Sequence, residues 1–140
     1  MQEHLKTKGR LAVYKNGELV GEYNNLVVSA GKNFVASRLA GVTDDVMSHM
    51  AIGTDSTAAD AADTTLATEA GRVALTSTNV VDNEITYTAT FGAGVGTGAI
   101  VEAGVLNASS AGTLLCRTVF SAINKGASDS ITITWTVTVS

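Results

Sequence analysis

Strict alternation of apolar and polar side chains marks the C-terminal segment of the chain. Five apolar residues occupy every second position and four threonines lie between them: Ile131, Ile133, Trp135, Val137 and Val139, against Thr132, Thr134, Thr136 and Thr138. Because successive side chains of a β-strand point to opposite faces, this pattern predicts a strand with one buried side. A shift of one residue would expose the whole apolar row, so the register of this strand is strongly specified.

The same alternation recurs through the second half of the chain. It predicts four further strands, at residues 72–78, 84–91, 99–106 and 113–120. Near the N-terminus, Asn16-Gly17 lies between two short alternating runs and suits a type I′ turn, so a hairpin is expected over residues 11–23. Residues 47–52 supply an eighth strand. We therefore expect an all-β fold, an eight-stranded antiparallel jelly-roll-like or Greek-key sandwich, because two packed sheets bury each alternating face once.

One short helix is expected directly after the N-terminal hairpin. Ser29 is suited to cap its start, and Gly41 is suited to end it. Phe34, Val35 and Leu39 fall on one side of this segment, which predicts a helix that runs to about residue 40.

A polar surface loop is expected at residues 53–63, because small and polar residues there offer too little apolar surface for a core element. Asp63 is expected to cap a single turn of helix that ends at Glu69. Asp55, Asp60 and Asp63 supply the oxygen ligands that calcium prefers, but their spacing lacks the central Gly and the closing Glu of an EF-hand loop. We therefore expect a solvated loop and no metal site.

Length and composition limit the class of protein. A chain of 140 residues is typical of one domain, and we expect an N-terminal arm at residues 1–9 and a single β-sandwich domain at residues 10–140. The net charge of −4 does not favour nucleic-acid binding. No secretory signal and no apolar run of about 18 residues is present, so we expect cytoplasmic synthesis and no membrane segment.

Candidate catalytic groups are few and scattered. Cys116 is the only thiol, and it shares its parity with apolar neighbours, so we expect a buried cysteine. The glycines of residues 92–98 occupy every second position, which differs from the G-x-G-x-x-G of a phosphate-binding loop and predicts a strand connection. Glu84 and Glu102 lie far apart in the sequence, so no paired acid and base is evident. We predict no catalytic, cofactor-binding or metal-binding residue and no enzyme activity.

Charge is distributed unevenly along the chain. Residues 1–41 hold six basic and three acidic residues, net +3, whereas residues 42–140 hold three and ten, net −7. The basic end begins with four residues: His4, Lys6, Lys8 and Arg10. One hypothesis is that these residues form an arm that docks on an acidic partner surface, since such fields steer association. The alternative is a merely solvated terminus.

Several segments resemble proteins of tailed-bacteriophage virions. The first is MAIGTDSTAADAADTTLATE (residues 50–69), followed by Arg72 and by ITYTATF (residues 85–91). The others lie further along the chain: IVEAGVLN (residues 100–107), LCRTVF (115–120), INKG (123–126) and ITITWTVTV (131–139). Together they resemble the capsid cement, or decoration, proteins of the Bordetella phage BPP-1 type, and related segments occur in phage tail and appendage proteins.

The resemblance implies a jelly-roll-like β fold bound to the outside of an icosahedral phage capsid. The expected partner is the major capsid protein, whose subunits the protein would bridge. A homo-oligomer, in the form of a dimer, is also expected, because two-fold assemblies are the commonest kind. The resemblance supplies no catalytic, cofactor or ligand residues.

Two other classes of function remain open. A tail-fibre, appendage or receptor-binding module of a phage virion is the first, although such modules more often belong to longer, multi-domain chains. A glycan hydrolase on a β-sandwich is the second. It would need a paired acid and base. It would also need aromatic residues for its sugar-binding platforms, and aromatic residues make up 5% of the chain.

Overall fold

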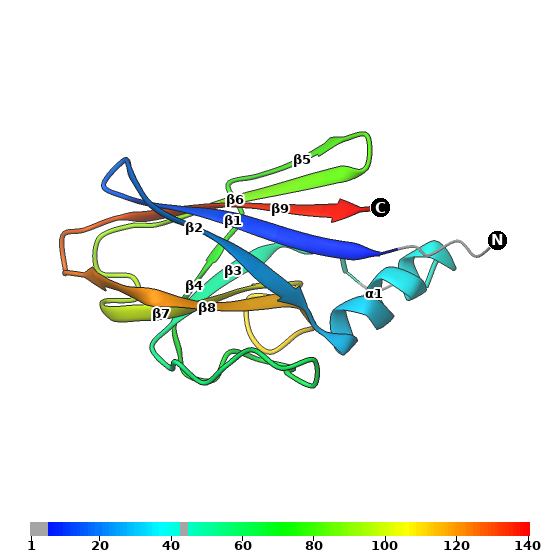
Figure 1. The fold of residues 1–140 in the computed structure, drawn as a ribbon, viewed down its shortest axis with the longest axis horizontal. Helices are drawn as coiled ribbons and strands as arrows, with labels where there is room; N and C mark the ends of the chain where they lie inside the picture. Colours follow the sequence, from blue (N-terminus) through cyan, green and yellow to red (C-terminus); the bar gives the residue numbers. More distant parts are fainter. Residues whose placement is uncertain (1–5, 43–44) are drawn as a thin grey trace.

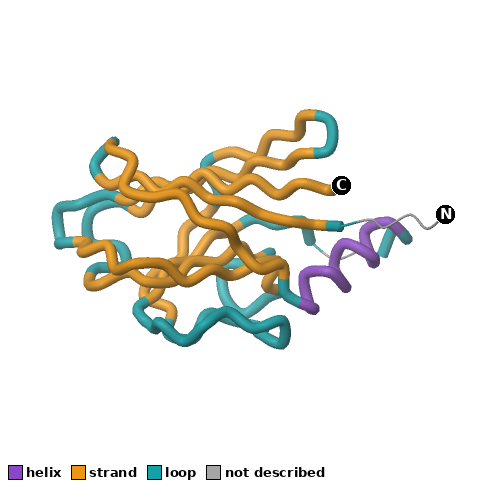
Figure 2. Tube along the Cα trace, viewed as in Figure 1, coloured by secondary structure: helices purple, strands orange, loops and turns teal. Residues whose placement is uncertain are grey.

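The computed structural model describes residues 6–42 and 45–140 and shows an all-β protein with one helix. Strands and helix follow one another as β1 (Thr7–Lys15), β2 (Glu18–Val27), α1 (Ser29–Leu39), β3 (His49–Gly53), β4 (Glu69–Ala74), β5 (Ser77–Val81), β6 (Glu84–Phe91), β7 (Gly98–Leu106), β8 (Leu114–Lys125) and β9 (Ile131–Val139). The predicted all-β class and the single helix after the N-terminal hairpin are therefore confirmed (Figures 1 and 2).

The strands form one curled antiparallel sheet in the order β4-β3-β7-β8-β2-β1-β9-β6-β5. Strand β2 joins its two halves, since residues Glu18 to Asn25 pair with β1 whereas Leu26 and Val27 pair with β8. The half made of β1, β9, β6 and β5 lies over the half made of β8, β7, β3 and β4 (Figure 1). Apolar side chains from both halves meet between them in a single main core.

Strand β9 runs through the middle of its half, between β1 and β6. Trp135 lies opposite Leu11 on one side and Tyr87 on the other, and its side chain is fully buried, as the alternation predicted. On the outer face the threonines of β9 face those of β6, and the hydroxyl oxygens of Thr90 and Thr132 lie 2.9 Å apart. The register expected from the sequence is therefore confirmed.

The hairpin at the N-terminus has the predicted turn. Asn16 and Gly17 both take positive φ angles, of 50° and 85°, and Lys15 pairs with Glu18 across the two-residue turn. Positive angles at both central positions are the requirement that Asn-Gly fulfils with least strain.

The predicted number of strands was wrong, because the described residues form nine rather than eight. The segment at residues 72–78 is divided into the end of β4 and the start of β5. Leu75 donates its N–H to Ser48 in one half of the sheet, and Thr76 donates to Thr88 in the other, so the chain crosses between the halves at this point. All five residues of β5 are exposed, and an exposed strand has no alternation of burial to mark it.

Helix α1 lies at one end of the molecule, next to the start of β1 (Figure 1). Gly31 packs against the backbone of Leu115 so closely that a Cβ there would overlap the carbonyl group. Ser29 does not cap the helix, because Val28 holds the capping position without a side-chain hydrogen bond. Leu39 is 78% exposed, unlike Phe34 on the same predicted face, because only the first turns of the helix contact the sheet.

Candidate functional site

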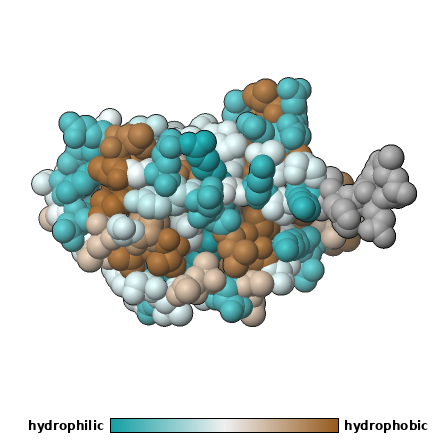
Figure 3. Space-filling model, in the orientation of Figure 1, coloured by the Kyte–Doolittle hydropathy of each residue, from teal (hydrophilic) through white to brown (hydrophobic). Residues whose placement is uncertain are grey.

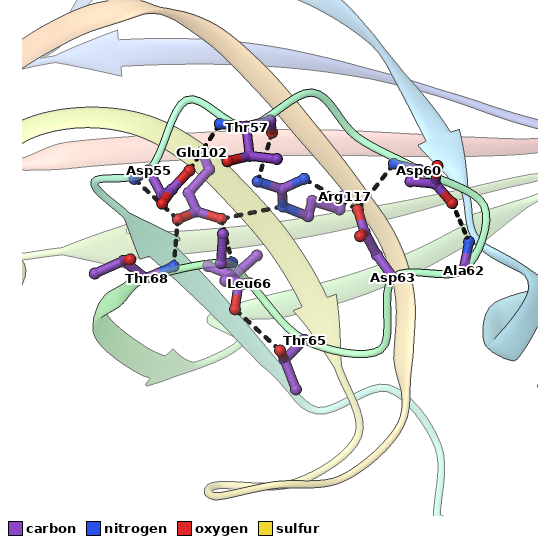
Figure 4. A network of polar contacts seen from close by, with 11 residues as sticks. Asp55, Thr57, Asp60, Ala62, Asp63, Thr65, Leu66, Thr68, Glu102 and Arg117 are labelled. Atoms are coloured by element: carbon purple, nitrogen blue, oxygen red, sulfur yellow. Dashed lines mark hydrogen bonds and ion pairs between the residues drawn. The ribbon is translucent and has the colours of Figure 1, made fainter.

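The most polar buried feature of the protein is an ion pair between Glu102 on β7 and Arg117 on β8. Both side chains are almost completely buried, and Arg117 Nε donates to Glu102 Oε1 over 3.0 Å. They lie on the outer face of the half-sheet, where residues 54–68 cross it without regular secondary structure (Figure 4). We call residues 54–68 the strap and the Glu102–Arg117 pair the clamp.

Glu102 holds the strap by its backbone. Its Oε2 accepts hydrogen bonds from the N–H groups of Asp55 at 3.1 Å and Thr68 at 2.8 Å, and its Oε1 accepts one from Ala67 at 2.8 Å. With Arg117, four donors therefore surround one buried carboxylate. A buried charge needs such partners, because the free energy of removing it from water is otherwise uncompensated.

Arg117 holds the middle of the strap. Its Nη1 donates to Asp63 Oδ2 at 3.0 Å, and its Nη2 donates to the carbonyl oxygen of Thr57 at 2.9 Å. The same oxygen of Asp63 accepts the N–H of Asp60. Asp63 therefore anchors the strap to the sheet, and the helical turn that it was expected to cap is absent from residues 64–69.

Two glycines make room for the strap. A Cβ at Gly53 would overlap the carbonyl oxygen of Thr68 and the carboxylate of Glu102, and a Cβ at Gly104 would meet Leu66. Leu66 then fills a second, smaller core beneath the strap together with four other residues: Val28, Ala51, Leu106 and Leu114. The half-sheet of β3, β7 and β8 is therefore covered on both faces.

The clamp is suited to holding the strap and not to bond-making chemistry. Each charged group of Glu102, Arg117 and Asp63 already has partners within the protein. Hydrogen bonds from Thr57, with a contribution from the charge of Arg117, lower the pKa of Asp55 below its usual value. Within residues 6–42 and 45–140, no group of three or more His, Cys, Asp and Glu side chains is placed to hold a metal ion.

The structure distributes the predicted arm residues over two surfaces. His4 lies outside the described residues. Lys6 exchanges backbone hydrogen bonds with Ser140, and residues 7–9, which we assigned to the arm, belong to β1. Lys8 and Arg10 line a shallow groove on the outer face of the sheet, where Arg10 Nη2 lies 2.6 Å from Glu22 Oε2.

The other predicted residues lie where the sequence suggested. Cys116 is fully buried in the main core, and burial raises the pKa of its thiol. The glycine run connects β6 to β7, as predicted, and Lys125 Nζ donates to the carbonyl oxygen of Gly92 at 2.8 Å. Glu84 begins β6 at the surface.

Sequence reasoning missed the clamp. Glu102 interrupts an otherwise apolar β7 and Arg117 follows the apolar start of β8, and this is the signal that marks them. Their partnership, however, depends on the pairing of β7 with β8, where Gly104 lies opposite Arg117.

Comparisons with protein families, with curated proteins and with solved structures find no match to this chain. Among the described residues, no helix is long and apolar enough to cross a membrane.

Proposed function

We propose that this protein is a structural virion protein of a tailed bacteriophage, made in the bacterial cytoplasm and bound to the outside of the icosahedral capsid. In this role it bridges subunits of the major capsid protein and stabilises the shell. The proposal includes no enzyme activity and no cofactor. Its alternative is a tail-fibre, appendage or receptor-binding module of the same kind of virion.

One observation carries the proposal. Three of the segments that resemble cement proteins, residues 50–69, 100–107 and 115–120, are far apart in the sequence and meet at the clamp (Figure 4). They contribute the strap, Glu102 and Arg117, respectively. The resembling segments thus come together in one feature of the fold, the strap held by the clamp, rather than in unconnected strands.

A fixed strap suits a protein that adds contacts between shell subunits. The strap carries exposed Ala, Ser and Thr side chains, and the clamp holds its backbone in one conformation. A loop that is ordered before binding loses less conformational entropy when it binds. This supports a binding role for the surface of the strap. The charged groups of the clamp are already paired within the protein, so they are not free to contact a substrate.

We also propose that the protein acts as a homodimer, which the two edges of the sheet support. At β4, Arg72 pairs with Glu69 and also donates to the carbonyl oxygens of Ala108 and Ala111. Strand β5, at the other edge, has no charged residue, and exposed apolar residues gather at its end, beside the polar tip of its hairpin with β6 (Figure 3). Uncharged, exposed edge strands pair readily with other strands, and a second copy would present the same edge.

The dimer has a direct test. Val80 is 64% exposed, so Val80→Lys should leave the fold intact while placing two like charges at a β5–β5 interface. Analytical ultracentrifugation should show a dimer for the parent and a monomer for the variant. Monomers for both, together with isolated single copies in a map of the head, would contradict the dimer.

The location in the virion has a separate test. Phage heads purified without tails should retain this protein in many copies, detected by mass spectrometry of the washed heads. Isolated tails should lack it. Retention on tails and absence from heads would contradict the capsid proposal and favour the appendage alternative.

A further inference from the structure

A second groove lies between α1 and the start of β1, at the end of the molecule opposite the β1–β2 turn (Figure 1). Its volume is about 540 Å³. The described residues that line it are three small or apolar residues of the helix, one of its lysines and two residues of the N-terminal segment: Val35, Ala36, Leu39, Lys32, Lys6 and Thr7. We call this the helix groove.

The helix groove has an apolar side that the other described residues leave open. Leu39 is 78% exposed, the largest exposed fraction among the large apolar side chains of the described residues. Val42, which follows the helix, is 50% exposed. Val35, one turn before Leu39, packs against the main core, so the apolar surface continues from the core to the helix end.

The described residues that line the helix groove carry charge of one sign. Lys6 and Lys32 line it, and no described lining residue is acidic. Neither lysine forms an ion pair with a described residue, whereas Arg10, Arg72 and Arg117 all do. These lysines belong to the basic first part of a chain whose net charge is −4.

We propose that the helix groove binds an acidic peptide segment of a partner protein, with a large apolar side chain of that segment packed against Leu39 and Val35. Carboxylates on either side of the apolar residue pair with Lys6 and Lys32. The inference deepens the proposed function. It rests on that function only for the identity of the partner, the major capsid protein. It replaces a linear basic arm by a pocket to which the helix contributes, in which Lys32 joins Lys6 and takes the place of Lys8 and Arg10, which line the other groove.

The test uses a synthetic peptide, so that it does not depend on phage heads. The probe is the blocked octapeptide Asp-Glu-Leu-Asp-Glu-Leu-Asp-Glu, titrated into the isotope-labelled full chain and followed by amide chemical shifts. Two matched peptides serve as controls, one with Lys in place of each acid and one with Ser in place of each Leu. We expect saturable shifts that centre on the helix groove for the first peptide and weaker binding, by about tenfold or more, for both controls.

Variants of the protein locate the contact. Lys32→Glu and Leu39→Ser should each weaken binding of the acidic peptide by about tenfold, because they remove the charge and the apolar contact separately. Lys8→Glu changes the net charge by the same amount as Lys32→Glu but lies on the outer face of the sheet, so it should leave the affinity within about twofold. Circular dichroism checks that all three variants are folded.

Several outcomes would overturn the inference. They are shifts spread over the whole surface, equal effects of Lys8→Glu and Lys32→Glu, or tight binding of the protein to vesicles of anionic lipid with no response to the peptide. Binding of parent and variants to purified heads is measured in parallel. Specific peptide binding without head binding would leave the helix groove standing and contradict the capsid proposal instead.

Discussion

The two halves of the curled sheet are stabilised in different ways. The half centred on β9 buries one face in the main core and carries rows of half-buried threonines on the other. In the half centred on β7, most of β3, β7 and β8 is buried on both faces, because the strap covers their outer side and is held there by a buried ion pair. Apolar alternation along β1, β6 and β9 defines the first half, and polar contacts between distant residues complete the second.

This difference affects how each half should respond to change. Shortening a side chain in an apolar core lowers the free energy of unfolding in proportion to the volume removed, and it destabilises the whole domain. A buried ion pair contributes little relative to an apolar replacement of both partners, but removing one partner leaves an uncompensated charge. The first half should therefore be sensitive to size and the second to incomplete pairing.

The largest effect is expected in the β9 half. Trp135→Ala should lower the free energy of unfolding by about 3–5 kcal/mol, because the fully buried indole fills the core between Leu11 and Tyr87. Urea denaturation followed by circular dichroism measures the loss. A native indole emission already typical of water, with a loss below about 1 kcal/mol, would show that the core is not organised around this residue.

Breaking the clamp should give the next largest loss of stability. Arg117→Met leaves the carboxylate of Glu102 buried without its cation and should cost about 3 kcal/mol. Amide hydrogen exchange should rise most in the strap, at Thr57 to Thr68. Arg10→Met is the matched control, since its ion pair with Glu22 is largely exposed and should contribute no more than about 1 kcal/mol. Equal losses for the two variants would remove the distinction between the clamp and a surface pair.

Alkaline pH should weaken the β9 half. Burial raises the pKa of Tyr87 to about 12 from an ordinary value of 10.0. The unfolded chain therefore releases this proton first, and the free energy of unfolding should fall as pH rises from about 10 to 12, by about 2 kcal/mol. Tyr87→Phe should remove this part of the slope. Identical pH dependence in the parent and in Tyr87→Phe would contradict a buried, protonated tyrosine.

Acid should act on the strap, with the smallest effect. The pKa of Asp55 is lowered from 3.8, chiefly by hydrogen bonds from Thr57. Its contribution to stability is therefore complete above pH 3.8 and is lost as pH falls through the lower folded-state value. Carboxyl chemical shifts of Asp55 measured against pH give the pKa directly. A value at or above 3.8 would show that this end of the strap is not ordered as described.

The sequence predicts the β9 half well because its information is local. The parity of Trp135 and its neighbours specifies the buried face, and Asn16-Gly17 specifies the hairpin turn without reference to any other part of the chain. Strand β5 escaped prediction because it is exposed along its whole length. Its pairing with β6 depends on the hairpin at Asp82 and Asn83 and on no apolar pattern.

The clamp escaped prediction for a different reason. Glu102, Arg117 and Asp63 become partners only after β7 pairs with β8 and the strap crosses them. Spacing along the sequence predicts only an isolated carboxylate at Glu102 and a helix cap at Asp63. Side-chain roles that depend on the meeting of three separate segments do not follow from spacing along one of them.

The most direct test of the proposed function is the rupture temperature of phage heads with and without this protein. Bare heads are mixed with increasing amounts of the purified protein, and release of their DNA is followed with a fluorescent dye during heating. A ligand that binds the assembled shell stabilises it by mass action, so the rupture temperature should rise with occupancy and then level off. An equal rupture temperature for bare and fully decorated heads would contradict the account.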